Sequence, residues 1–220
     1  MRNKKGLVLI SLGIVLILLA LGLVVWNLQE QAHAAVTSDA ALAFLEEQVP
    51  DAEVVVSGAN NGFTEDVYTQ QLAGYAEIEI PDYLLDPERE MPVLNHEGQD
   101  YIGTLSLPAL GLELPIISQW SYPALKLAPC RYTGSAYLDD LVLMGHNYTS
   151  HFRTLPDLQV GDRVVFTDVD GNTFTYEVAV KETLPPTAVE EMTAGDWPLT
   201  LFTCTVGGTS RFTVRCDKVE

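Results

Sequence analysis

The stretch LTLFTCTVGGTSRFTVRC, residues 199–216, decides how this chain folds. It consists of two runs rich in β-branched and aromatic residues, which are separated by Val206-Gly207-Gly208. Glycines between two such runs are typical of a turn that joins antiparallel strands. The stretch therefore predicts a β-hairpin, and the hairpin brings Arg211 back alongside Cys204.

Short runs of the same kind precede the hairpin, and all of them follow Asp100. They span residues 101–107, 112–117, 141–144, 163–167 and 173–181. The last of these alternates between apolar and polar side chains, which indicates a strand with one buried face. Short strands between turn residues, without a long amphipathic helix, predict an all-β barrel or sandwich for residues 100–220.

The N-terminus has a different character. Residues 7–26 are twenty consecutive residues without a charge, enough to cross roughly 30 Å of hydrocarbon as a helix. Arg2, Lys4 and Lys5 precede this run and are expected to stay in the cytoplasm, so residues 27–220 would face outward. A cleaved signal peptide with a site at Ala32-His33-Ala34 is the alternative, but the run exceeds the usual apolar length of about 7–15 residues.

The charge is uneven along the chain. Lys and Arg total 12 and Asp and Glu total 30, a net charge of −18, and the first 26 residues contain none of the acidic ones. Such an acidic exterior cannot neutralise phosphates, which argues against nucleic acid as a partner, and the 47% apolar content excludes a disordered chain. Residues 27–99 are predicted to form an acidic stalk. It contains a short helix that is capped by Thr37-Ser38-Asp39 and stopped by Pro50.

Two strand ends carry the candidate chemistry. Cys204 ends an apolar run, and His146 directly follows another one in Leu143-Met144-Gly145-His146-Asn147. A nucleophilic cysteine needs a proton acceptor and a group that stabilises the anion formed during acyl transfer. His146 and Arg211 could supply these two functions.

The other two cysteines leave alternatives open. Cys130 and Cys216 show no C-x-x-C spacing, so the sequence predicts no zinc site. Three cysteines cannot all pair within one chain, so at least one thiol is free. Cys130 could be a buried thiol, a disulfide partner of Cys216, or functional.

These residues carry a family resemblance. Thr200-Leu201-Phe202-Thr203-Cys204 resembles the T-L-x-T-C signature of sortases, the cysteine transpeptidases of Gram-positive surfaces. Gly145-His146-Asn147 is similar to their catalytic histidine motif, and residues 211–215 resemble the segment that begins with their catalytic arginine. Ile102-Gly103-Thr104-Leu105-Ser106-Leu107-Pro108 resembles the opening of their barrel.

The resemblance implies a closed eight-stranded β-barrel with short helices, preceded in the chain by one N-terminal transmembrane helix. It implies that the enzyme cleaves a sorting signal of LPXTG type through a thioacyl intermediate on Cys204. His146 would act as general acid and base, and Arg211 would hold the substrate carbonyl or the developing oxyanion. Arg215 lies four residues beyond Arg211, on the same face of the strand, and is the alternative arginine. An amine of the peptidoglycan precursor or of a pilin lysine would then resolve the intermediate. Four further residues are candidates for substrate contact: Arg131, Asn147, Thr203 and Arg215.

Several alternatives accompany this interpretation. The first barrel motifs and residues 129–135 look closer to class B-like sortases, while a pilus-type sortase is the alternative within the enzyme class. A catalytically idle sortase-like binding module is the alternative outside it. Asp86-Pro87 could belong to a lid over the active site.

No cofactor is expected from the sequence. A calcium site is conceivable, although solvated loop charge explains the same residues better. The acidic side chains concerned are Asp139, Asp140, Glu190, Glu191 and Asp196.

Overall fold

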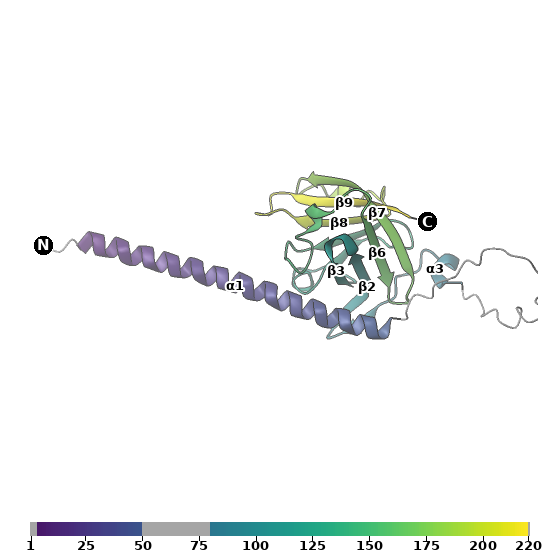
Figure 1. Ribbon diagram of the computed structural model, residues 1–220, viewed down its shortest axis with the longest axis horizontal. Helices are drawn as coiled ribbons and strands as arrows, with labels where there is room; N and C mark the ends of the chain where they lie inside the picture. Colours follow the sequence, from purple (N-terminus) through teal and green to yellow (C-terminus); the bar gives the residue numbers. More distant parts are fainter. Residues whose placement is uncertain (1–3, 50–79, 220) are drawn as a thin grey trace, which may run out of the picture.

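The computed structural model describes residues 4–49 and 80–219, and its most extended element is the helix α1 (Lys4–Gln48). Figure 1 shows α1 leading from the N-terminus to a β-barrel and running along one side of it. The helix is long and apolar enough to cross a membrane from Val8 onward. It thus contains the predicted transmembrane segment and continues far beyond it.

The sequence predicted a separate short helix that begins at residues 37–39, and this prediction is wrong. Helix α1 passes through this point without a break. The Thr37 hydroxyl donates to the His33 carbonyl at 3.0 Å, one turn earlier, instead of capping a new helix. No Gly or Pro stands between Gly22 and Pro50 to interrupt the helix. The rest of the predicted stalk, residues 50–79, lies outside the described residues.

Residues 80–219 contain nine strands, and eight of them close into a barrel. Their order in the sheet is β1-β2-β3-β4-β5-β8-β9-β7-β6, and β6 pairs back onto β2. Strand β1 pairs with β2 outside the closed ring. The predicted eight-stranded barrel is therefore confirmed. The strands are β1 (Leu94–His96), β2 (Gln99–Leu107), β3 (Leu112–Ile117), β4 (Cys130–Thr133), β5 (Leu141–Gly145), β6 (Arg163–Asp168), β7 (Thr173–Leu184), β8 (Leu199–Cys204) and β9 (Arg211–Lys218).

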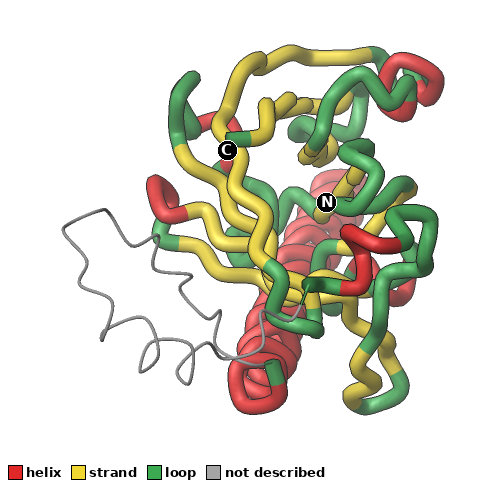
Figure 2. The backbone as a smooth tube through the Cα atoms, turned by 90° about the vertical axis from the view of Figure 1, so that its right-hand side faces the viewer, coloured by secondary structure: helices red, strands yellow, loops and turns green. Residues whose placement is uncertain are grey.

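Short helical segments precede the first strand and connect the later ones. They are α3 (Asp82–Leu85), η2 (Pro108–Leu110), α4 (Tyr122–Leu125), η3 (Leu155–Asp157) and α5 (Val189–Thr193). Figure 2 views the barrel roughly along α1, with these segments around its rim. Two of them, α4 and α5, lie in the loops that border the site described below.

Apolar side chains fill the barrel. Leu105, Phe166 and Leu201 are fully buried in the central cluster, and they come from strands far apart in the sequence. A second cluster forms where Ala41 and Leu45 of α1 pack against the outside of the barrel. The C-terminal half of α1 is therefore part of the folded domain.

Cys130 and Cys216 are both free thiols and both are buried. Cys216 lies in the central cluster and Cys130 in the cluster under α1, so the disulfide between them that the sequence left open does not form. Burial raises the pKa of each thiol to about 12, which keeps both in the unreactive neutral form.

Candidate active site

The strand register brings the three candidate residues together. Strands β5 and β8 are parallel, and Gly145 is the register partner of Thr203, so His146 and Cys204 follow at the same edge of the sheet. Strand β9 is antiparallel to β8, and Cys204 is the partner of Arg211. The sequence predicted this pairing of Cys204 with Arg211 from the hairpin, and it is confirmed.

A cavity of about 210 Å³ opens between these residues. His146, Cys204 and Arg211 all line it. Its remaining wall is mostly apolar and comes from the 118–132 region, from strands β5 and β8, and from the loop that contains α5. The apolar residues are Trp120, Tyr122, Leu125, Tyr132, Met144, Pro186, Val189, Met192 and Phe202.

His146 is half-buried and held by ring stacking. Its imidazole stacks on Tyr148 with 4.7 Å between the ring centroids and an interplanar angle of 22°. A side chain at Gly145 would place its Cβ 2.6 Å from the ring of Phe152, which explains why the position before the histidine has none. Burial lowers the pKa of His146, the carboxylate of Glu30 opposes this shift, and the Lys126 ammonium adds to it. The imidazole is therefore predominantly neutral at neutral pH.

Arg211 directly follows a tight turn between β8 and β9. Within the turn, the Thr205 N–H donates to the Ser210 carbonyl at 3.0 Å. Gly207 and Gly208 have φ angles of 85° and 71°, a conformation that residues with a side chain rarely adopt. Arg211 Nη1 donates to the carbonyls of Gly208 and Ser210, and Nε and Nη2 have no partner among the described residues. These two nitrogens can bind an anion or a carbonyl in the cavity.

The comparisons agree with this geometry. A family model of the sortase domain matches residues 105–219, more than half of the chain and all three candidate residues. The chain belongs to the sortase family. None of the curated proteins that were compared matches it.

Solved sortase structures share the fold. The Clostridium perfringens sortase D5 transpeptidase has 18% identity and a TM-score of 0.56, over 84% of this chain and 99% of that one. Sortase C of the same species, solved with a C-terminal cell wall sorting motif, has 21% identity and a TM-score of 0.52, over 70% and 97%. Sortase A from Corynebacterium diphtheriae has 22% identity and a TM-score of 0.50, over 83% and 84%. Their names span several classes, and the class B-like assignment stays a prediction.

The four candidates for substrate contact do not line the catalytic cavity. They are Arg131, Asn147, Thr203 and Arg215. Thr203 alternates with the cavity residues Phe202 and Cys204 along β8, so its buried side chain turns away from them. Asn147 is half-buried beside His146. Their contact with substrate in this sortase stays a prediction.

Arg215 is 4% exposed, and all three nitrogens of its guanidinium donate to protein atoms. Nε donates to Glu182 Oε1 at 2.8 Å, and Nη1 donates to Thr200 Oγ1 at 3.0 Å. Further bonds reach the carbonyls of Met192 at 3.3 Å and Glu191 at 2.7 Å. Arg215 thus ties the loop that contains α5 to strands β7 and β8, and this loop forms one wall of the catalytic cavity.

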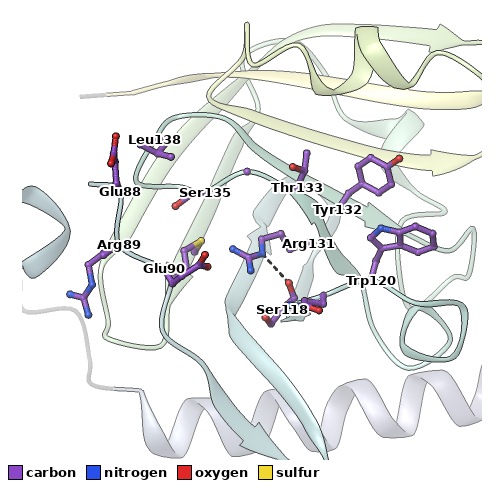
Figure 3. Close-up of a pocket in the computed structure, with 13 residues that line it drawn as sticks. Glu88, Arg89, Glu90, Ser118, Trp120, Arg131, Tyr132, Thr133, Ser135 and Leu138 are labelled. Atoms are coloured by element: carbon purple, nitrogen blue, oxygen red, sulfur yellow. Dashed lines mark hydrogen bonds between the residues drawn. The ribbon is translucent and has the colours of Figure 1, made fainter. Parts of the chain in front are cut away.

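Arg131 lines a second cavity of about 470 Å³, which shares Trp120 and Tyr132 with the catalytic one. Figure 3 shows Arg131 extending into this cavity towards Glu90, while its Nε donates to the Ser118 carbonyl at 2.9 Å. Residues 88–91, which follow the suggested lid motif, line the second cavity and not the catalytic one.

Three of the acidic side chains considered for calcium, Asp140, Glu191 and Asp196, line one small pocket, but they do not form a metal-binding group. No group of three or more His, Cys, Asp or Glu side chains that could hold a metal occurs in residues 4–49 and 80–219. Asp139 binds Lys218 at 2.6 Å, and Asp140 accepts the Ser135 N–H at 2.7 Å. Both carboxylates thus have a structural role, and calcium stays an untested alternative to the expectation of no cofactor.

The aromatic wall of the cavity is the part of the site that sequence reasoning missed. Trp120 stacks on Tyr132 at 5.8 Å between centroids, and Tyr132 meets Phe202 edge-on at 5.4 Å. The available signal was Trp120-Ser121-Tyr122-Pro123, a run of aromatic residues in a loop where a soluble protein gains nothing from exposing them.

Proposed function

We propose that this sortase is an active transpeptidase that cleaves an LPXTG-like sorting signal and transfers the cleaved protein to an amine of the cell wall. The observation that carries the proposal is the meeting of Cys204, His146 and Arg211 in one cavity. A thiol, an imidazole and a guanidinium are the nucleophile, the acid–base and the anion stabiliser that acyl transfer through a cysteine requires.

The chemistry follows from the positions of the three groups. Cys204 Sγ, as thiolate, attacks the Thr carbonyl carbon of the signal, and the oxygen takes up the negative charge next to Arg211. The C–N bond then breaks, the protonated His146 gives its proton to the departing Gly amine, and a thioester remains on Cys204. The incoming amine passes a proton to His146 as it attacks the thioester, which restores the thiolate and the imidazolium.

The state of His146 is consistent with slow turnover. Burial lowers the pKa of its imidazole, so the thiolate–imidazolium pair is a minor species at neutral pH. The rate would then reflect the small fraction of enzyme in this form. The apolar walls on the other side of the cavity suit the Leu and Pro side chains of an LPXTG-type signal.

The N-terminal helix fits the same function. Arg2, Lys4 and Lys5 precede the apolar segment, so the barrel would lie on the outer face of the cell membrane, where sorting signals and wall amines occur. The partners would be proteins with sorting signals and an amine of the peptidoglycan precursor. A pilin lysine is the alternative acceptor.

The test uses the full-length protein in detergent with a library of quenched LPXTG-type peptides. We expect slow cleavage, faster formation of a ligated product when an amine is added, and no reaction with Cys204→Ala. The Cys130→Ala variant removes a buried thiol and is the matched control, which should react like the wild type.

The other outcomes separate the alternatives. Cleavage that survives Cys204→Ala contradicts the proposed mechanism. Absence of cleavage, together with a Cys204 that does not react with alkylating reagents, favours the idle binding module. Preference for a lysine-bearing pilin peptide over a peptidoglycan stem amine favours the pilus-type enzyme.

A further inference from the structure

Helix α1 is fixed to the barrel along one stripe. Ala34, Ser38, Ala41 and Leu45 are 0–4% exposed, and their spacing of four, three and four residues places them on one helix face. Phe44 extends this contact, because its ring stacks on His96 at 4.4 Å between centroids. The helix carries no Gly or Pro between the apolar segment and this stripe. The membrane segment and the barrel are thus joined by one stiff rod.

The first contact between the rod and the barrel lies beside the catalytic cavity. Glu30 forms an ion pair with Lys126, the residue that follows α4. Both charges act on the pKa of His146, and Leu125, next to Lys126, lines the cavity. Glu30 is four residues beyond Trp26, the last residue of the apolar segment, which corresponds to about 6 Å along a helix.

The barrel is oriented with its catalytic end towards the membrane segment. Strand β9 begins at Arg211 in the cavity and ends near the C-terminus. In Figure 1 the C-terminus lies at the end of the barrel away from the N-terminal half of α1, and the turn between β8 and β9 lies at the opposite end. The catalytic end and the apolar segment therefore lie on the same side.

The loops at this end differ in charge from the rest of the exterior. Residues 118–129, 145–153 and 205–210, which we call the catalytic-end loops, contain no Asp or Glu in a chain that has 30 of them. The acidic part of the α5 loop lies elsewhere, since Glu191 and Asp196 line a pocket with Asp140 and Thr200 near the beginning of β5 and β8. The low negative charge of the catalytic-end loops suits contact with anionic lipid headgroups.

The same loops expose apolar and aromatic side chains. Tyr122 is 74% exposed, Val206 86% and Trp120 41%. Amphipathic aromatic rings are enriched at the level of lipid headgroups, where one edge is apolar and the other is hydrated. Exposed rings at the one end that faces the membrane segment indicate a surface with an apolar partner.

We propose that the catalytic-end loops lie against the phospholipid headgroup layer and that α1 holds them there. The inference rests on the proposed membrane attachment and adds a binding surface to it. The cavity would then open at the membrane surface, where it receives sorting signals whose own apolar tails keep them in the bilayer. Signals free in solution would gain nothing from this placement.

Tryptophan quenching tests the proposal without relying on catalysis. Full-length single-tryptophan forms that keep Trp26, Trp120 or Trp197, with Phe at the other two positions, are placed in phosphatidylcholine–phosphatidylglycerol vesicles. Trp197 is the internal control, because it lies beside Asp140 and Arg215 at the opposite end of β8. Headgroup spin labels should quench Trp120 at least twofold more than Trp197, and acyl-chain labels should quench Trp26.

Equal quenching of Trp120 and Trp197 would overturn the proposal, and so would a Trp26 that acyl-chain labels do not reach. Val206→Glu provides a second arm, with Val160→Glu as the matched control beside the C-terminal end of β9. We expect Val206→Glu to slow cleavage of a membrane-tethered signal several-fold, with the soluble peptide unaffected and Val160→Glu unchanged on both. If the wild type cleaves neither substrate, the proposed function fails while the quenching result still decides the docking.

Discussion

The catalytic cavity and the buried part of the barrel around it use the same three residue types in opposite ways. Each offers a cysteine, a histidine and an arginine. In the cavity they are Cys204, His146 and Arg211, and in the buried set they are Cys216, His151 and Arg215. Residue type alone therefore does not identify the site.

The two sets differ in their exposure to solvent and in the number of hydrogen-bonding groups that are still free. Cys204 is partly exposed, whereas Cys216 is fully buried and burial raises the pKa of its thiol to about 12. Arg211 keeps two guanidinium nitrogens without a partner among the described residues, whereas Arg215 is held by side chains and carbonyls on three sides. The cavity set is available for chemistry, and the buried set stabilises the frame around it.

The cysteine pair should give the largest difference. We expect Cys204→Ala to lower the peptide cleavage rate by at least about 1,000-fold, because the covalent step is lost. Cys216→Ala should leave kcat unchanged and lower the midpoint of urea unfolding. Steady-state cleavage and urea titrations of both variants measure this, and a loss of kcat in a folded Cys216→Ala protein would break the distinction.

The arginine pair should separate activity from stability. Arg211→Ala is expected to reduce kcat/KM by about 100- to 1,000-fold, because the oxyanion loses its charged donor. Its unfolding free energy should change little, since the side chain binds only carbonyls of its own turn.

Arg215→Ala should do the reverse. It leaves Glu182 unpaired and the carbonyls of the α5 loop without a donor, at a cost of about 3 kcal/mol in unfolding free energy. The looser loop should raise KM more than it lowers kcat. Urea unfolding and steady-state kinetics on both variants provide the measurement, and equal stability of the two would contradict the assignment.

Of the two histidines, the buried His151 should make the stability of the protein depend on pH. Burial lowers the pKa of His151 from its ordinary value to about 4. The Leu127 backbone raises this pKa, but its effect is weaker than that of burial. The stability that comes from its neutral form is present above about pH 6.5 and is lost as the pH falls towards 4, by about 3 kcal/mol. His151→Leu should flatten this part of the stability profile. Urea unfolding at pH 7.5 and 4.5 checks it, and an unchanged slope would refute the burial argument.

The smallest effect concerns the ion pair between Glu30 of α1 and Lys126 beside the cavity. Glu30 raises and Lys126 lowers the pKa of His146. Glu30→Gln should therefore lower the imidazole pKa further, and Lys126→Met should raise it. An NMR titration of the His146 ring in detergent measures both, and shifts of the same sign in the two variants would show that α1 does not reach the cavity.

The sequence was sufficient for the parts of the site that depend on strand ends. Cys204 and Arg211 meet because a glycine turn joins their strands, and His146 follows an apolar run that becomes the parallel neighbour of β8. The sequence placed Arg215 on the same face of the strand as Arg211. It did not show that the α5 loop would cover one arginine and leave the other open, because that depends on packing between distant segments.

The N-terminal helix shows the same limit. Thr37-Ser38-Asp39 is a typical start of a helix, but a chain already helical at that point satisfies the Thr37 hydroxyl with the carbonyl of the preceding turn. The stacking of Trp120 on Tyr132 in the cavity wall also depends on tertiary packing, which no local pattern contains.

The most direct test of the central claim is the capture of the acyl-enzyme. Full-length protein is mixed with an LPXTG-type peptide, quenched in acid, digested and analysed by mass spectrometry. The account predicts an added mass that corresponds to the peptide up to its Thr, located on the fragment that contains Cys204 and removed by hydroxylamine. Cleavage of the peptide with no adduct on Cys204, or with the adduct on another residue, would contradict it.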